Sequence, residues 1–314
     1  MSAVRGQPAT DLAGGAVAPE TAAGPPPAGS ARRPAAGHHE MEAAGKHEII
    51  AANRLVRALA ALRAERRCAL IPYIMAGDPD VPATERFVEA LAEAGASAVE
   101  LGVPFSDPIA DGPINQRAGL RAMAQGMGIR PALDLVAKLR TRTQLPFLIM
   151  TYYNLILRYG PGTFARDAAS AGLDGLIAAD LPPDAARDLI GEARRSGLAT
   201  VFMAAPTSTP ERIRAVAAAS SGFVYCVSRT GVTGVRDALP EGLPELLRRI
   251  RAETETPVCV GFGISRPAQA REIAKIADGV IVGSALVQMI EETPRDVARV
   301  GAFVRDLATA IAET

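Results

Sequence analysis

Histidine, lysine and tryptophan are the scarce residues of this 314-residue sequence, and each shortage narrows the chemistry available to it. There is no tryptophan, and the lysines and histidines are Lys46, Lys138, Lys275, His38, His39 and His47. Because no histidine follows residue 47, a site in the main part of the chain must move protons with carboxylates or tyrosines. It also cannot hold a metal through imidazoles, so we expect no metal site there.

Cysteine is nearly as rare. Cys68, Cys226 and Cys259 lie in or beside apolar, strand-like runs and lack the paired spacing of metal ligands. This pattern argues against a structural zinc and against a disulfide framework. We therefore expect buried thiols that stay reduced.

The sequence has neither an excess of one charge nor a long apolar run. Its 34 basic and 34 acidic residues cancel, whereas nucleic acids and anionic membranes attract a basic surface. No apolar run approaches the ~18 residues of a membrane span. We expect no nucleic-acid or membrane partner and a cytoplasmic protein.

Residues 1–45 are rich in alanine, glycine and proline and show no helical or alternating apolar period. They are predicted to be a disordered tail, without the continuous apolar core of a secretory signal. The adjacent His38 and His39 are interpreted as incidental. Residues 46–314 are predicted to form one domain.

The rest of the chain alternates apolar strands with helices. A helix is expected from residue 49, before the first strand. Strand-like runs then occur at 68–75, after Gly95 to about Glu100, and at 145–154, 175–180, 199–206, 223–234 with its loop, 257–264 and 279–286. Eight such units in about 270 residues, against ~250 for the typical fold, predict a (β/α)8 TIM barrel. An open doubly wound sheet is the alternative, because counting strands does not prove closure.

An acidic stretch follows the second strand. Residues 99–113 read VELGVPFSDPIADGP, in which an apolar run meets a carboxylate and a proline-stiffened loop carries two more. A carboxylate at the mouth of an apolar barrel is desolvated, which raises its pKa and lets it exchange a proton near neutral pH. Glu100 is the strongest functional candidate here, with Asp111 beside it. Asp107 is interpreted as a turn or cap residue.

Glycines gather at the ends of the last three strands. Such positions expose backbone amides, and barrels commonly bind phosphate between the last two loops and a helix N-terminus. Tight turns are the alternative explanation. The residues concerned are Gly231, Gly234, Gly261, Gly263, Gly283 and Ser284.

Apolar and aromatic side chains occupy the other strand ends. Each of them alone could be a core residue. Between a carboxylate and a phosphate cradle they predict together a pocket for a flat, apolar ring. They are Tyr73, Met150, Ile177, Ala179, Met203 and Tyr225.

Five motifs, in their order and spacing, resemble the tryptophan synthase α chain family: ELGVPFSDPIADGP, LIMTYYN, SRTGVTG, GFGIS and VGSAL. The resemblance runs from about Pro72 to the last helix. It implies a retro-aldol cleavage of indole-3-glycerol phosphate to indole and glyceraldehyde 3-phosphate. It also implies an α2β2 tetramer in which indole passes to a β chain that carries pyridoxal phosphate, with no cofactor in this chain.

The resemblance also assigns roles to residues. Glu100 and Asp111 correspond to the catalytic acids, Tyr225 to the active-site tyrosine and Thr233 to the threonine of a mobile closing loop. The phosphate positions are Gly234, Gly263, Gly283 and Ser284. The indole pocket falls on Tyr73, Met150, Ile177, Ala179 and Met203. Two departures are that family members often carry Phe where Tyr73 stands, and that the tail has no counterpart.

The chemistry fits two carboxylates. Cleavage requires protonation of the indole ring carbon, removal of the glycerol hydroxyl proton and stabilisation of the indolenine through its ring nitrogen. We assign the first two tasks to Glu100 and the third to Asp111. Aldolases that use a Schiff-base lysine or a histidine-bound zinc, and an indole-glycerol-phosphate synthase with its lysine acid, do not fit this sequence.

Three other functions remain open from the sequence. A phosphosugar isomerase or epimerase would share the phosphate site, although the apolar pocket argues against it. A non-catalytic subunit that only activates a β chain would keep the loop of Pro104 and Asp107, which the family uses at that contact. A stand-alone indole-releasing lyase is the third.

Overall fold

The computed structural model describes residues 50, 52–228, 242–261 and 263–314, and in this part the strands form a barrel. All strand pairs are parallel, and neighbours follow the order β5-β4-β3-β2-β1-β9-β8-β7-β6. The strands are β1 Ala69–Met75, β2 Val99–Gly102, β3 Phe147–Thr151, β4 Gly175–Ala178, β5 Ala199–Thr200, β6 Phe202–Ala204, β7 Val224–Val227, β8 Val258–Gly261 and β9 Gly279–Val282. The two ends of this order, β5 and β6, are separated by one residue of the chain, which brings the sheet back on itself and confirms the predicted TIM barrel.

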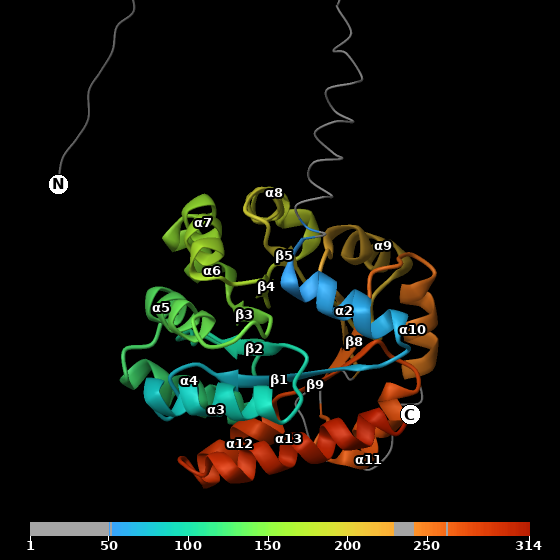
Figure 1. The fold of residues 1–314 in the computed structure, drawn as a ribbon. Helices are drawn as coiled ribbons and strands as arrows, with labels where there is room; N and C mark the ends of the chain where they lie inside the picture. The colour runs from blue at the N-terminus through green and yellow to red at the C-terminus, as the bar shows by residue number, and fades with distance from the viewer. Residues whose placement is uncertain (1–49, 51, 229–241, 262) are drawn as a thin grey trace, which may run out of the picture.

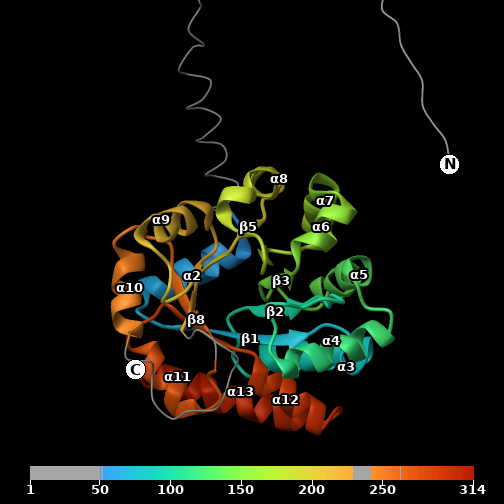
Figure 2. The same ribbon diagram turned by 180° about the vertical axis from the view of Figure 1, so that it is seen from behind.

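The helices lie outside the strands, except for the helix at Arg54–Ala64, which packs against the barrel interior. Figures 1 and 2 show α3, α4, α11, α12 and α13 together on one side of the barrel. The helices are α2 Arg54–Ala64, α3 Val81–Glu93, α4 Pro113–Ala124, α5 Ile129–Arg140, α6 Tyr153–Tyr159, α7 Pro161–Ala171, α8 Arg187–Arg195, α9 Pro210–Ala219, α10 Leu243–Arg251, α11 Pro267–Ala274, α12 Ser284–Glu292 and α13 Val297–Ala312, with a 3-10 turn at Pro183–Ala185. No helix of the described residues is long and apolar enough to span a bilayer.

The predicted fifth strand is divided at Val201. On the side of β7, the amide of Thr200 bonds the Ser221 hydroxyl (3.0 Å) and the amide of Phe202 bonds the Ser220 hydroxyl (3.2 Å). Side chains therefore replace strand carbonyls at this point. The Val201 amide still bonds the Leu176 carbonyl of β4 (3.1 Å), so the barrel wall continues through the break.

Two predicted strands extend too far into the following helices. The strand predicted at 145–154 ends at Thr151, because Tyr153 begins α6. The strand predicted at 279–286 ends at Val282, because Ser284 begins α12. The apolar residues of α12 stay buried, as they would in a strand, which is why composition alone misleads here. Residues 293–296 separate α12 from α13, and the Asp296 side chain caps α13.

The barrel interior is a separate apolar layer closed by α2. Leu55 and Leu59 of α2 belong to the same buried cluster as the inward-facing residues of the strands, among them Ile71, Leu148 and Ile177. Figure 1 shows α2, in blue, in front of the strands and inside the ring of outer helices. The expected N-terminal helix therefore plugs one end of the barrel.

Asp174 joins this plug to the wall. Its carboxylate is 2% exposed, forms ion pairs of 2.8 Å with Arg54 and Arg140, and accepts the amide of Phe147 (2.9 Å). Its carbonyl accepts the side-chain amide of Asn53 (2.7 Å). Burial raises the pKa of Asp174, and the Phe147 amide and the two arginines oppose that rise. One acid thus connects α2, α5 and the starts of two strands.

The three cysteines are free thiols, and two of them have the expected burial. Cys226 and Cys259 are buried and Cys68 is half-buried. Burial raises the pKa of the Cys226 thiol to about 12, so this thiol stays protonated at neutral pH.

Candidate active site

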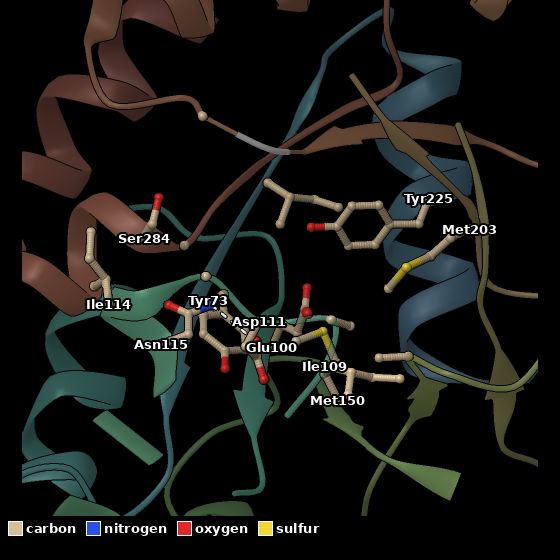
Figure 3. A pocket seen from close by; sticks show the side chains of 16 residues that line it. Tyr73, Glu100, Ile109, Asp111, Ile114, Asn115, Met150, Met203, Tyr225 and Ser284 are labelled. Carbon is tan, nitrogen blue, oxygen red and sulfur yellow. Dashed lines mark hydrogen bonds between the residues drawn. The ribbon is translucent and has the colours of Figure 1, made fainter. Parts of the chain in front are cut away.

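A cavity of about 380 Å³ opens at the carboxyl ends of the strands, the place where TIM barrels carry their sites. Tyr225 and Met203 form one wall and Tyr73, Asp111 and Asn115 another (Figure 3). Its lining consists of Tyr73, Glu100, Ile109, Ala110, Asp111, Gly112, Ile114, Asn115, Met150, Ala179, Met203, Tyr225, Gly263, Ile281, Gly283 and Ser284.

Glu100 is the second of the four residues of β2, where the sequence predicts a position near the end of a short strand. It lies in register with Tyr73 of β1 and Leu148 of β3, so its side chain points into the barrel. It is 1% exposed, and its Oε2 atom has no hydrogen-bond partner. Burial, and then the charge of Asp111, raises the pKa of Glu100 to about 8. This carboxyl group can therefore exchange a proton near neutral pH.

Asp111 approaches the cavity from the loop between β2 and α4. The Tyr152 hydroxyl donates to its Oδ2 (2.9 Å), and Asn115 Nδ2 lies at 3.4 Å from its Oδ1. Burial raises the pKa of Asp111, while these two hydrogen bonds oppose the rise. The site thus contains one carboxyl group with an oxygen that has no partner, and one that accepts two donors.

Two tyrosines border the acids. Tyr73 and Tyr225 are buried, and burial is the largest cause that raises the pKa of each well above its ordinary value, so both stay neutral donors. Glycines make room for them, because a Cβ atom at Gly102 would overlap the Tyr73 hydroxyl and one at Gly261 would overlap the Tyr225 hydroxyl. Small residues at two strand ends are therefore part of the pocket's shape.

The buried acid makes the stability of the fold depend on pH. Glu100 has an ordinary pKa of 4.5 and a folded pKa of about 8, so between these values the folded chain holds a proton that the unfolded chain has released. Stability then falls as pH rises, by at most about 1.4 kcal/mol per pH unit. We expect Glu100→Gln, which cannot ionise, to gain melting temperature relative to the wild type between pH 5 and pH 8. Thermal melts at several pH values test this, and a constant difference would contradict it.

Four of the five residues predicted for the indole pocket line the cavity. Tyr73, Met150, Ala179 and Met203 line the cavity. Ile177 does not line the cavity, because it lies two positions before Ala179. Its side chain is 1% exposed and belongs to the interior cluster, against which Met150 and Met203 pack. It supports the floor of the pocket.

The opposite end of the cavity is formed by the predicted phosphate positions. Gly263, Gly283 and Ser284 line it, and Ser284 is the first residue of α12, whose N-terminus has no side-chain cap. Such a helix start favours an anion. The predicted Gly234, Thr233 and Gly231 lie outside the described residues, as does the tail 1–45.

Several residues of the site were not singled out from the sequence. Ile109, Ile114 and Ile281 line the cavity, and Asn115 and Tyr152 contact Asp111. The spacing of Asn115, four residues after Asp111 and one turn into α4, was an available signal. In the described residues no cluster of histidine, cysteine and acidic side chains could hold a metal ion.

Comparisons with known proteins agree on one family. A family model described as "Tryptophan synthase alpha chain" matches residues 59–312. The tryptophan synthase alpha chain of Geobacter sulfurreducens is 48% identical over 82% of this chain and 99% of its own length, and that of Solibacter usitatus is 45% identical over 81% and 96%.

Solved structures give the same result. A chain of Mycobacterium tuberculosis tryptophan synthase aligns with a TM-score of 0.77 at 43% identity, over 83% of this chain and 98% of its own. Tryptophan synthase subunit alpha of Legionella pneumophila aligns with the same score at 36% identity, over 83% and 99%. The chain therefore belongs to the tryptophan synthase alpha chain family.

Proposed function

We propose that this chain is the lyase subunit that cleaves indole-3-glycerol phosphate into indole and glyceraldehyde 3-phosphate in tryptophan biosynthesis. The observation that carries the proposal is Glu100, a buried carboxyl group with a raised pKa and an oxygen without a hydrogen-bond partner, at a cavity with an apolar wall. The cavity also supplies a second acid and a helix start at its far end. Each corresponds to one part of the substrate.

The substrate fits this cavity in one direction. The phosphate would lie against Gly263, Gly283 and the N-terminus of α12, where backbone amides and the helix dipole stabilise an anion. The indole ring would then occupy the apolar wall of Met150, Ala179 and Met203, in the half that Asp111 and Glu100 border. Gly234 and Thr233 are proposed to complete the phosphate site and the closure.

Two proton transfers and one hydrogen bond complete the reaction. Glu100 in its neutral form gives a proton to the ring carbon that carries the glycerol chain, and its carboxylate then accepts the hydroxyl proton of the neighbouring carbon. The bond between these carbons breaks, the hydroxyl carbon becomes the aldehyde, and Glu100 is protonated again. Asp111 accepts a hydrogen bond from the ring N–H while positive charge develops on the ring nitrogen. Tyr225 borders the reacting atoms.

We propose a β chain as the partner, in an α2β2 tetramer in the cytoplasm. Pyridoxal phosphate would then belong to the β chain, and this chain would use no cofactor. The loop at 103–112 supports such a contact, because Ile109 is 85% exposed, a large apolar side chain at the mouth of the cavity, with Asp107 also exposed beside it. Indole released in the cavity would pass through this face to the partner.

Purified chain mixed with indole-3-glycerol phosphate tests the proposal. We expect slow release of indole by the chain alone and faster release after a β chain is added. Equal rates would identify a stand-alone lyase. Absence of indole under both conditions would contradict the proposed activity and favour an activating subunit or a phosphosugar isomerase, which a coupled assay for isomerised sugar phosphates would distinguish.

A further inference from the structure

A tyrosine outside the cavity holds the acidic loop in place. Tyr152 directly follows β3 and is 3% exposed, and it is not one of the residues that line the cavity. Its hydroxyl accepts the backbone amide of Ala110 (3.0 Å) and donates to Oδ2 of Asp111 (2.9 Å). One side chain therefore contacts both the backbone and the carboxylate of this loop.

The direction of these hydrogen bonds limits the state of Asp111. A phenol carries one hydrogen, and because the Ala110 amide donates to the oxygen, that hydrogen points to Asp111. Burial, and then the charge of Asp111, raises the pKa of Tyr152, so the phenol stays protonated. A fixed donor favours the ionised carboxylate and opposes the burial that would neutralise it.

The same strand end holds the first half of the loop. The Tyr152 ring packs on Phe105 with centroids 5.2 Å apart, and the Val103 amide donates to the Met150 carbonyl (2.8 Å). The Thr151 hydroxyl also reaches the Val103 carbonyl (3.3 Å). Three consecutive residues, 150–152, thus contact the loop from its start to Asp111.

We propose that Tyr152 is a positioning residue that keeps Asp111 ionised and aimed at the ring nitrogen of the substrate. The inference rests on the proposed function for its effect on catalysis. Its structural part, the attachment of the loop, does not depend on the reaction. The two parts therefore have separate measurements.

The first measurement is the pH profile of indole release by Tyr152→Phe. We expect kcat to fall about tenfold to a hundredfold, since a hydrogen bond to a charged group is lost, with little change in KM. Activity requires ionised Asp111, and loss of the donor raises its pKa, so the acidic limb of the profile should move to higher pH. In an Asp111→Asn background the same substitution should have an effect of less than about twofold.

The second measurement is hydrogen exchange of the Ala110 amide in the free protein. Tyr152→Phe should accelerate this exchange, because the amide loses its acceptor. Tyr159→Phe is the matched control, since it removes a hydroxyl that donates to Asp167 (2.7 Å) on outer helices. It should leave the Ala110 exchange and the pH profile unchanged.

The outcomes are separable. An unchanged pH profile and unchanged exchange in Tyr152→Phe would overturn the inference, and so would equal losses in the control. If the wild type releases no indole, the proposed function fails and the catalytic part falls with it, whereas the exchange of Ala110 still decides whether Tyr152 holds the loop.

Discussion

Replacement of Glu100 by glutamine is expected to abolish indole release while indole-3-glycerol phosphate still binds. Glutamine keeps the size of the side chain but can neither give nor accept the proton, and general acid–base catalysis contributes roughly 10²- to 10⁴-fold. Because Glu100 is buried and its Oε2 has no partner in the structure, the substitution removes no hydrogen bond of that atom. Indole release and substrate binding by calorimetry measure the two parts separately.

Asp107→Asn serves as the control in the chain without a partner. Asp107 lies exposed in the same loop, and its carboxylate accepts a hydrogen bond from the Ser106 hydroxyl (2.6 Å). This variant should keep its basal turnover. Near-normal turnover in Glu100→Gln would show that the assignment of Glu100 is wrong, and loss of binding together with turnover would indicate a damaged pocket.

Replacement of Asp174 by alanine is expected to have the largest effect on stability. The substitution removes the carboxylate partner of Arg140, which is 14% exposed and keeps backbone carbonyls as acceptors, and it leaves the amide of Phe147 without its acceptor. Removal of one partner of a buried ion pair costs about 3–5 kcal/mol. The free energy of unfolding, measured by urea titration, should fall by this amount.

Asp184→Ala provides the comparison for this variant. Asp184 is 78% exposed and lies 3.6 Å from Arg212, so its loss should change the unfolding free energy by less than about 1 kcal/mol. Similar effects of the two substitutions would mean that Asp174 does not join α2 to the barrel as its contacts suggest.

The alternation of apolar runs was enough to predict the barrel. Buried parallel strands require continuous apolar runs and the crossover helices require an apolar stripe, and both signals are local. The boundaries were less predictable where burial is uniform. Ser284 begins a helix inside an apolar run that is typical of a strand. The hydroxyls of Ser220 and Ser221 divide the fifth strand through hydrogen bonds that the spacing of apolar residues does not indicate.

The residues of the site also fall into those that the sequence predicts and those that only the folded structure brings together. The meeting of Glu100, Asp111, Gly263 and Gly283 at one cavity could be predicted, because the topology of a barrel brings the ends of its strands together. Tyr152 could not, since it bonds a residue 41 positions earlier through a contact that only the folded structure creates. Ile177 failed to line the cavity for a related reason: a shift of two residues along a strand moves a side chain to the layer beneath.

The position of α2 decides how this protein can be handled. The side chain of Asn53 bonds the carbonyls of Asp174 and Gly197, which lie just before β4 and β5, so the chain enters the fold at the amino ends of the strands. The cavity opens at the other end. A purification tag or a surface attachment joined ahead of α2 would therefore leave the mouth of the barrel facing the solution, free for substrate and for a docked partner.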